Sequence, residues 1–269
     1  NLNGRLISPE DLQKMMSQLE ISPGIKLRAG PAILYRQGNY NLWTTHNFLS
    51  SLNFKIINPP SAFLETRDKW KSYLSFKKNS IPTPKTMSAM ELLFEWSGKQ
   101  DVVEKDLVQV SVKYLYQAAT EQLKLPFILK KRFSGQGRGV FLINHLHELE
   151  TILNADATDF QSANVLEKNY YLADIMNDSK PIQIEKQQFL YRWIFQECIH
   201  ESLGNDVRAF VISNIFFSIE RSNPNSFLSN LHQGGVALNT NLSESEYAYC
   251  LKMHLESNLN YSGIDFMRT

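Results

Sequence analysis

The residues with the clearest chemical potential lie in three places along the chain. Lys130 ends the apolar run Pro126 to Lys130, and a glycine-rich stretch from Ser134 to Gly139, here called the glycine loop, follows it. A polar stretch, Ser229 to Gly235, reads Ser-Asn-Leu-His-Gln-Gly-Gly, and Asp265 stands in an otherwise apolar run. A lysine, approachable backbone N–H groups and a carboxylate suit a phosphate chain and its metal ion. The sequence therefore predicts a nucleotide–metal site.

The glycine loop favours this interpretation without proving it. Gly135, Gly137 and Gly139 alternate, so backbone N–H groups can approach an anion closely. An ordinary glycine turn fits the pattern equally well, and Lys130 alone also fits a solvated strand end. A Rossmann turn requires a helix directly after its glycines, whereas the apolar run Val140 to Ile143 follows here. We therefore expect strand, loop and strand.

Two further stretches could contact a nucleotide. Phe195 to Ile199 ends an apolar run, which could offer backbone groups to a purine or could simply be a core strand. Asp206 and Arg208 lie two residues apart, so they share one face of a strand. A carboxylate can accept from ribose hydroxyls and a guanidinium can bind phosphate or carboxylate, although a surface ion pair fits equally well. Arg221, which follows Glu220, admits the same two interpretations.

The position of Asp265 within an apolar strand is difficult to explain by structure alone. A carboxylate within an apolar strand must be paired, metal-bound or exposed. Mg²⁺ on nucleotide phosphates is a fitting partner, because it binds through one or two carboxylates plus substrate oxygens. His232 has no histidine at ligand spacing around it, so we do not predict a zinc site.

Composition narrows the function classes. The 28 basic and 27 acidic residues give a net charge of +1, which provides no field for gathering nucleic acid or an anionic membrane. Only Cys198 and Cys250 are cysteines, so we expect no disulfide scaffold and a reducing, cytoplasmic location. No apolar run approaches the roughly 18 residues of a membrane span, and the residues from Asn1 do not read as a signal peptide.

The pattern of apolar residues predicts an α/β protein. A strand over 31–35, a helix over 43–52 and a second strand over 54–57 indicate a small N-terminal lobe. A helix capped by Thr66 should break at Asn79, and the prolines of 81–86 require an extended linker. The remaining predicted helices are 88–98, 107–123, 145–155 and one capped by Ser243, and the remaining strands are 126–130, 140–143, 191–195, 207–212, 215–220 and 262–267.

In their order along the chain, these motifs resemble the ATP-grasp superfamily, and within it the RimK-like ligases, which add glutamate or related amino acids to a carboxylate. The matching stretches are Arg67-Asp68-Lys69, 81–84, 126–140, 196–199, 206–208, 229–235 and 263–268. The resemblance implies an ATP-grasp fold of α+β lobes with a small N-terminal α/β domain over 1–66. The ATP-grasp domain would span 67–269, with a lid subdomain over about 80–190 and a C-terminal subdomain over about 191–269.

The resemblance also implies roles for individual residues. Lys69 and Lys130 would contact the phosphates, and Lys130 would also lie near the adenine. The adenine hinge would be formed by Gln196, Glu197, Cys198 and Ile199. Asp206 would bind the ribose, and Ser229 would make a further nucleotide contact. The glycine loop, with Gly135, Gln136 and Gly137, would close over the triphosphate as a lid. Catalytic contacts would come from Arg208 and Arg221 at the acyl phosphate or acceptor carboxylate and from Asn230 by the phosphates. Asp265 would coordinate Mg²⁺, or Mn²⁺ in its place.

The function that the resemblance implies is an ATP-dependent carboxylate–amine ligase acting through an acyl phosphate. Its partners would be a small-molecule or peptide carboxylate and an amino-acid amine, and homo-oligomers are frequent among such ligases. Two departures stand out: Leu228 replaces the family's usual arginine, and the family's further glutamate and asparagine metal ligands would lie beyond Thr269. We therefore expect a truncated C-terminal subdomain, and the alternative function is an ATP-grasp-shaped nucleotide-binding module without ligase activity.

Overall fold

The computed structural model describes residues 26–27, 32–34, 55–93, 112–135, 137–161, 191–212 and 215–269. The predicted helix over 43–52 lies outside these residues. Strand β1 (Lys26–Leu27) pairs with β2 (Ala32–Leu34), and β2 runs parallel to β3 (Lys55–Ile57). A parallel pair is what two consecutive strands joined by a long crossover form, so the predicted strands of the N-terminal lobe are confirmed.

Two helices, rather than the single one predicted, follow β3. Helix α3 (Pro60–Arg67) and helix α4 (Lys69–Lys78) meet at Asp68, whose side chain accepts a hydrogen bond from the Trp70 N–H at 3.0 Å and caps α4. The prediction of Thr66 as the N-cap was therefore wrong, because its hydroxyl bonds within α3, to the Ala62 carbonyl. The break at Asp68 makes Lys69 the first residue of α4.

A four-stranded antiparallel sheet, here called the middle sheet, has the order β4-β7-β5-β6. Its strands are β4 (Thr86–Ser88), β5 (Phe127–Lys131), β6 (Val140–Ile143) and β7 (Trp193–Glu197). The β5–β6 pair confirms the predicted strand, loop and strand. Because β7 pairs with both β4 and β5, it belongs to this sheet. The predicted subdomain boundary near residue 191 would separate β7 from β4 and β5, its partners in this sheet. A boundary after Glu197 would keep the sheet in one subdomain.

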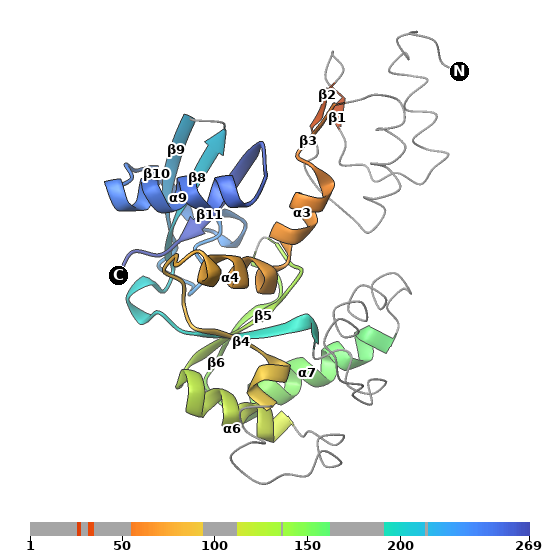
Figure 1. Ribbon diagram of the computed structural model, residues 1–269. Coiled ribbons are helices and arrows are strands. Elements are labelled where there is room, and N and C mark those ends of the chain that lie inside the picture. The colour runs from red at the N-terminus through yellow and green to blue at the C-terminus, as the bar shows by residue number, and fades with distance from the viewer. Residues whose placement is uncertain are drawn as a thin grey trace, which may run out of the picture.

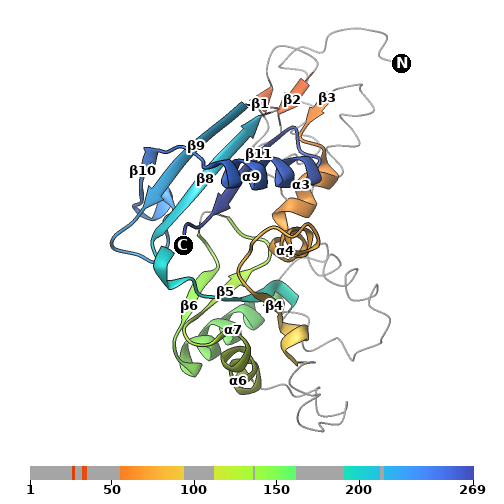
Figure 2. The same ribbon diagram turned by 60° about the vertical axis from the view of Figure 1, so that its left-hand side comes forward.

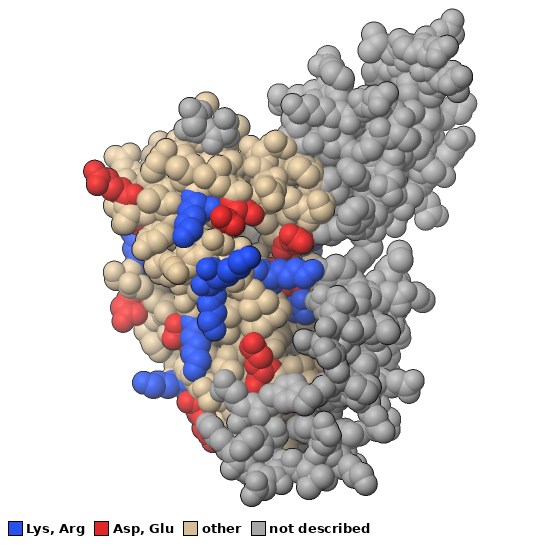
Figure 3. Space-filling view, in the orientation of Figure 1, with Lys and Arg blue, Asp and Glu red and all other residues tan. Residues whose placement is uncertain are grey.

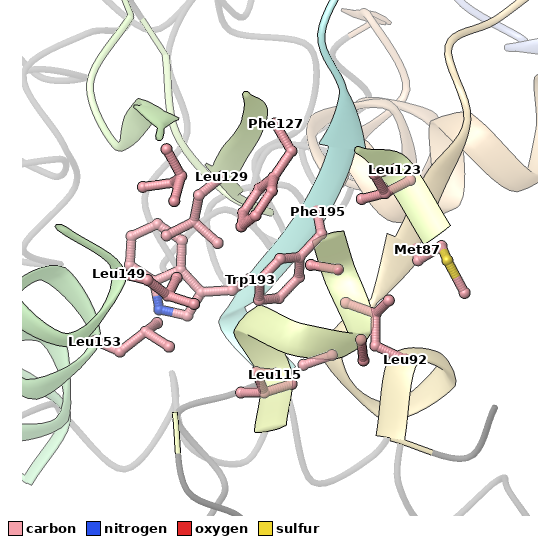
Figure 4. Packing of buried hydrophobic residues seen from close by; sticks show 14 of the residues in the cluster. Met87, Leu92, Leu115, Leu123, Phe127, Leu129, Leu149, Leu153, Trp193 and Phe195 are labelled. Atoms are coloured by element: carbon pink, nitrogen blue, oxygen red, sulfur yellow. The ribbon is translucent and has the colours of Figure 1, made fainter. Parts of the chain in front are cut away.

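The main hydrophobic core lies between the middle sheet and two helices, α6 (Val112–Leu123) and α7 (Leu146–Gln161). Trp193, Phe127 and Phe195 are its largest fully buried side chains, and Leu115 and Leu149 reach them from the two helices (Figure 4). Burial of a side chain of this size contributes about 1.5–3 kcal/mol. The core therefore fixes the strands that end at the glycine loop.

The second four-stranded sheet, here called the C-terminal sheet, has the order β10-β9-β8-β11 and is antiparallel throughout. Its strands are β8 (Asn205–Ile212), β9 (Ile215–Ser222), β10 (Val236–Asn239) and β11 (Tyr261–Phe266). The predicted hairpin and final strand are confirmed, whereas β10 was not predicted. Helix α9 (Glu244–Glu256) covers one face, and Ser243 with Glu246 forms the predicted capping box.

The two sheets form two halves, and α4 lies beside their junction in both views (Figures 1 and 2). The chain crosses from β7 to β8 through a 3-10 turn, η3 (His200–Ser202). Lys and Arg side chains gather over the region of α4, with acidic side chains among them (Figure 3). Within the described part of the chain, no helix has both the length and the apolar character needed to cross a bilayer.

Candidate functional site

A cavity of about 400 Å³ lies where the two sheets meet. Thirteen of the predicted site residues line it: Lys69, Lys130, Gly135, Gly137, Gln196, Glu197, Cys198, Ile199, Asp206, Arg208, Ser229, Asn230 and Asp265. Arg221 does not line the cavity but contacts two of its acids, and Gln136 lies outside the described residues. Residues separated by nearly two hundred positions in the sequence thus share one cavity.

Lys130 reaches the cavity from the end of β5. Its Nζ donates to Oε1 of Gln196 at 2.5 Å, and the Gln196 amide in turn donates to the Thr86 hydroxyl at 2.8 Å. Burial lowers the pKa of Lys130 to about 8, against the opposing effect of the Asp265 charge. A largely desolvated ammonium next to open space is suited to an anionic ligand, which would offset the cost of its burial.

Lys69 reaches the cavity from the first turn of α4, but its ammonium is already surrounded by oxygen atoms. Nζ donates to the Lys131 carbonyl at 2.8 Å, and to the Ser134 carbonyl and hydroxyl at 2.9 and 2.8 Å. Burial, and then the charge of Lys130, lower the pKa of Lys69 to about 7. The structure therefore connects Lys69 to the base of the glycine loop, a contact that the sequence did not predict.

The predicted adenine hinge continues β7. The Glu197 N–H donates to the Lys85 carbonyl at 2.9 Å, and the Glu197 carboxylate accepts from the Lys85 N–H at 2.6 Å. Burial raises the pKa of the Cys198 thiol, so this side chain stays neutral. The cavity also has apolar lining that the sequence analysis missed: Ile128, Val140, Leu203, Phe266 and Met267. Apolar walls next to a strand end suit a purine ring.

Two arginine–aspartate pairs form the polar floor of the site on the C-terminal sheet. Arg208 binds both oxygens of Asp265, each at 2.6 Å, from the adjacent strand. Arg221 binds both oxygens of Asp206 and also lies 3.1 Å from Asp265 Oδ1. The hydrogen bond that the Arg208 guanidinium donates to Asp265 is the largest cause of a raised pKa for Arg208. Asp206 and Arg208 share one face of β8, as predicted, and each forms its ion pair with a residue of a neighbouring strand rather than with the other.

The polar stretch 229–235 folds back on itself around a 3-10 turn, η4 (Leu231–Gln233). Its paired glycines have a steric reason: Gly234 has a φ of +89°, and a Cβ on Gly235 would lie 2.2 Å from the Ser229 carbonyl oxygen. This fold brings Asn230 against the glycine loop, where a Cβ on Gly137 would lie 2.9 Å from its Oδ1. His232, in the same stretch, is exposed and does not line the cavity.

The acids of the cavity bear on metal binding. Among the residues that the structure describes, no group of three or more His, Cys, Asp or Glu side chains is arranged to hold a metal ion. Asp265 presents a partly exposed carboxylate to the cavity. One carboxylate is enough for Mg²⁺ only where nucleotide phosphate oxygens and water molecules supply the remaining ligands of the ion.

The sheets and the cavity between them are those of an ATP-grasp protein, and comparison with known proteins defines the family. Residues 66–269 match the RimK-like ATP-grasp domain. The chain belongs to the RimK-like ATP-grasp family, which confirms the resemblance drawn from its motifs.

Similar sequences are named as ligases. The chain is 28% identical over 232 residues to a probable alpha-L-glutamate ligase of Shewanella halifaxensis (strain HAW-EB4), a match that covers 86% of this chain and 40% of that protein. It is 25% identical over 218 residues to a protein of the same name from Pasteurella multocida (strain Pm70), covering 80% of this chain and 53% of that one. The chain thus spans about half the length of such relatives, or less.

Solved structures agree on the fold. The D-alanine–D-alanine ligase of Bacillus anthracis complexed with ATP has a TM-score of 0.55 and 15% identity, with 100% of this chain and 69% of that chain covered. An ADP complex of an N5-carboxyaminoimidazole ribonucleotide synthetase has a TM-score of 0.52 and 12% identity, with 97% of this chain and 54% of that chain covered. At this identity the likeness concerns the fold alone.

Proposed function

We propose that the protein is an ATP-dependent carboxylate–amine ligase that acts through an acyl phosphate. The observation that carries the proposal is the shared cavity, in which Lys130 from the middle sheet and Asp265 from the C-terminal sheet line the same space. The ligase names of the sequence relatives support the reaction class.

ATP would bind along the cavity from the hinge to the polar floor. Backbone groups of residues 196–199 would hold the adenine, with Ile128 and Met267 among its apolar walls, and Asp206 would accept from the ribose hydroxyls. Lys130 would bind the phosphates, beneath the glycine loop.

The reaction would need positioning and charge rather than a nucleophilic side chain. The acceptor carboxylate oxygen attacks the γ-phosphorus of ATP, the bond to the β-phosphate oxygen breaks, and ADP leaves. The amine nitrogen then attacks the acyl carbon, the acyl–phosphate C–O bond breaks, inorganic phosphate leaves, and the amine gives up its proton. Arg208, Arg221 and Asn230 would stabilise the charge that develops on the transferred group.

We propose Mg²⁺, with Mn²⁺ as a substitute, as the metal ion of this site. Asp265 would be its one carboxylate ligand from the described residues, with nucleotide phosphate oxygens as further ligands. When bound, the ion would neutralise phosphate charge.

The substrates follow from the same comparisons. The names of the relatives favour glutamate as the amine, and a peptide, protein or small carboxylate is the proposed acceptor. Leu228, which lines the cavity, offers no charge to that acceptor. Assembly into a homo-oligomer and a cytoplasmic location stay predictions, which light scattering and cell fractionation would test.

An ADP-release assay tests the proposal. With Mg-ATP, glutamate and a panel of carboxylate acceptors, ADP should form only when a suitable acceptor is present. Asp265→Asn should lower this rate about 100-fold, because removal of one charge-stabilising group typically costs two to three orders of magnitude. Glu244→Gln, on the exposed first turn of α9, is the matched control. ATP binding without acceptor-dependent ADP would instead favour a nucleotide-binding module without ligase activity.

A further inference from the structure

A charged cluster at the junction of α4 and the middle sheet suggests how the glycine loop is held. Lys69 Nζ has four oxygen neighbours within 3.3 Å: the carbonyls of Lys131, Arg132 and Ser134, and the Ser134 hydroxyl. An ammonium has only three N–H donors, so these oxygens satisfy it fully. All of them belong to the four residues that lead from β5 into the glycine loop.

Asp68 strengthens the same connection from the preceding position. Its carboxylate accepts from Arg132 Nε at 3.0 Å and from Arg132 NH2 at 2.5 Å, while Oδ1 also accepts from the Trp70 N–H. The side chains of Asp68 and Arg132 are 0% and 5% exposed. A buried bidentate pair has little freedom to rearrange, so α4 and the end of β5 move together.

The far end of the glycine loop returns to the same place. The Lys131 N–H donates to the Gly139 carbonyl at 2.7 Å, and Gly139 lies against the Lys131 side chain. Between these ends, Gly135 and Gly137 line the cavity. The position of the loop over the cavity therefore depends on the segment 131–134, which Lys69 and Asp68 hold.

We propose that Asp68, Lys69 and Arg132 form an anchor that fixes the base of the glycine loop to the first turn of α4, and that they are positioning residues for the nucleotide. The claim that these residues hold the glycine loop follows from the geometry alone. The claim that they position the nucleotide rests on the proposed function. Lys69 then serves the nucleotide mainly by holding the loop over it.

Hydrogen exchange of the nucleotide-free protein tests the anchor directly. In Lys69→Met and Asp68→Asn, the peptide spanning 133–140 should exchange about tenfold faster, since loss of one charged hydrogen bond is worth at least a factor of ten. Lys69→Arg, which keeps a charged donor, should restore part of the protection. Peptides from β9 should be unchanged in every variant.

Lys78→Met is the matched control, because it removes an exposed lysine from the last turn of the same helix. If Asp68→Asn fails to fold, Lys69→Met and Ser134→Ala still test the anchor. Unchanged exchange at 133–140 in Lys69→Met would overturn the proposal.

ATP titration supplies the functional half of the test. With an intact fold, Lys69→Met should raise the KM for ATP about tenfold while kcat falls less, because a displaced loop weakens binding more than chemistry. Equal falls in kcat and kcat/KM would contradict a positioning role. If the unaltered protein binds no ATP, the proposed function fails, whereas the exchange result still decides whether the anchor exists.

Discussion

At the scale of single residues, the low pKa of Lys130 makes a prediction about pH. Burial brings this pKa from the ordinary 10.5 to about 8. Below pH 8 the ammonium is charged and attracts phosphate, whereas above it the free protein must first take up a proton to bind ATP. We expect the Kd for ATP to rise by up to tenfold per pH unit between about 8 and 10, which isothermal titration calorimetry can follow.

Lys130→Arg provides the comparison, because a guanidinium stays charged throughout this range. Its pH dependence should be flatter than that of the natural protein. The folded state holds the Lys130 proton less tightly than the unfolded chain does, so this residue should also make the free energy of unfolding rise between pH 8 and 10.5. A Kd independent of pH in the natural protein would contradict the proposed phosphate contact.

The sequence identified most of the residues that share the cavity, some as polar groups at the ends of apolar strands and the others through the resemblance to the ATP-grasp family. It could not identify their partners. Lys69 bonds oxygens more than 60 positions away, and Arg221 pairs with Asp206 because the β8–β9 register places them opposite each other. Apolar lining residues such as Ile128 carry no chemical signal that separates them from the core.

At the scale of elements, Asp156 connects α7 to the strands of the middle sheet. This buried carboxylate lies 2.6 Å from Lys131 Nζ and 3.1 Å from Arg192 NH1, and it accepts from Trp193 Nε1 at 2.7 Å. We predict that Asp156→Leu lowers the free energy of unfolding by about 3–5 kcal/mol, because two cations lose their partner. Chemical denaturation measures the change.

His147→Ala, at an exposed position of α7, is the control and should stay within about 0.5 kcal/mol of the natural protein. An equally small change in Asp156→Leu would mean that the cluster contributes little to the stability of the middle sheet.

Sequence patterns predicted most elements but not all of their ends. The strands around the glycine loop follow directly from apolar runs bounded by glycine, and the Ser243–Glu246 cap is a local signal. The break at Asp68 was missed although the carboxylate that caps α4 is a local signal, and only its second contact, with Arg132 directly after β5, is tertiary. The sheet that β7 joins was likewise missed, because strand partners are not encoded locally.

At the scale of the whole molecule, Gly137 brings the glycine loop against the C-terminal half. Its φ is +74°, and a Cβ there would lie 2.9 Å from Asn230 Oδ1 and 3.3 Å from Leu228 Cδ1. Gly137→Ala should therefore hold the loop away from Asn230 and raise the Kd for ATP about tenfold, since an alanine with positive φ costs about 1–2 kcal/mol before any clash. Fluorescence titration with a labelled nucleotide measures it.

Gly234→Ala separates strain from contact. Its φ of +89° imposes a similar backbone cost, but nothing lies within 4 Å of the added Cβ. We expect lower stability with nearly unchanged ATP binding. Equal losses of affinity in both variants would attribute the effect of Gly137→Ala to general destabilisation.

The division into two sheets could be predicted only in outline from the sequence. The order of motifs implied an ATP-grasp fold, but the volume between the sheets depends on contacts such as Gly137 with Asn230, which join segments about 90 positions apart. No local pattern encodes such a distance.

The crossing from β7 to β8 has a mechanical consequence. Cys198, Ile199, Ser202 and Leu203 all line the cavity within this short covalent bridge, which also joins the two sheets. If a bound molecule contacts the bridge, its affinity depends on the angle between the two halves. Binding of the molecule and the angle between the halves are then thermodynamically linked. Substitutions remote from the cavity that merely stiffen or loosen the bridge should then change affinity without altering one ligand contact.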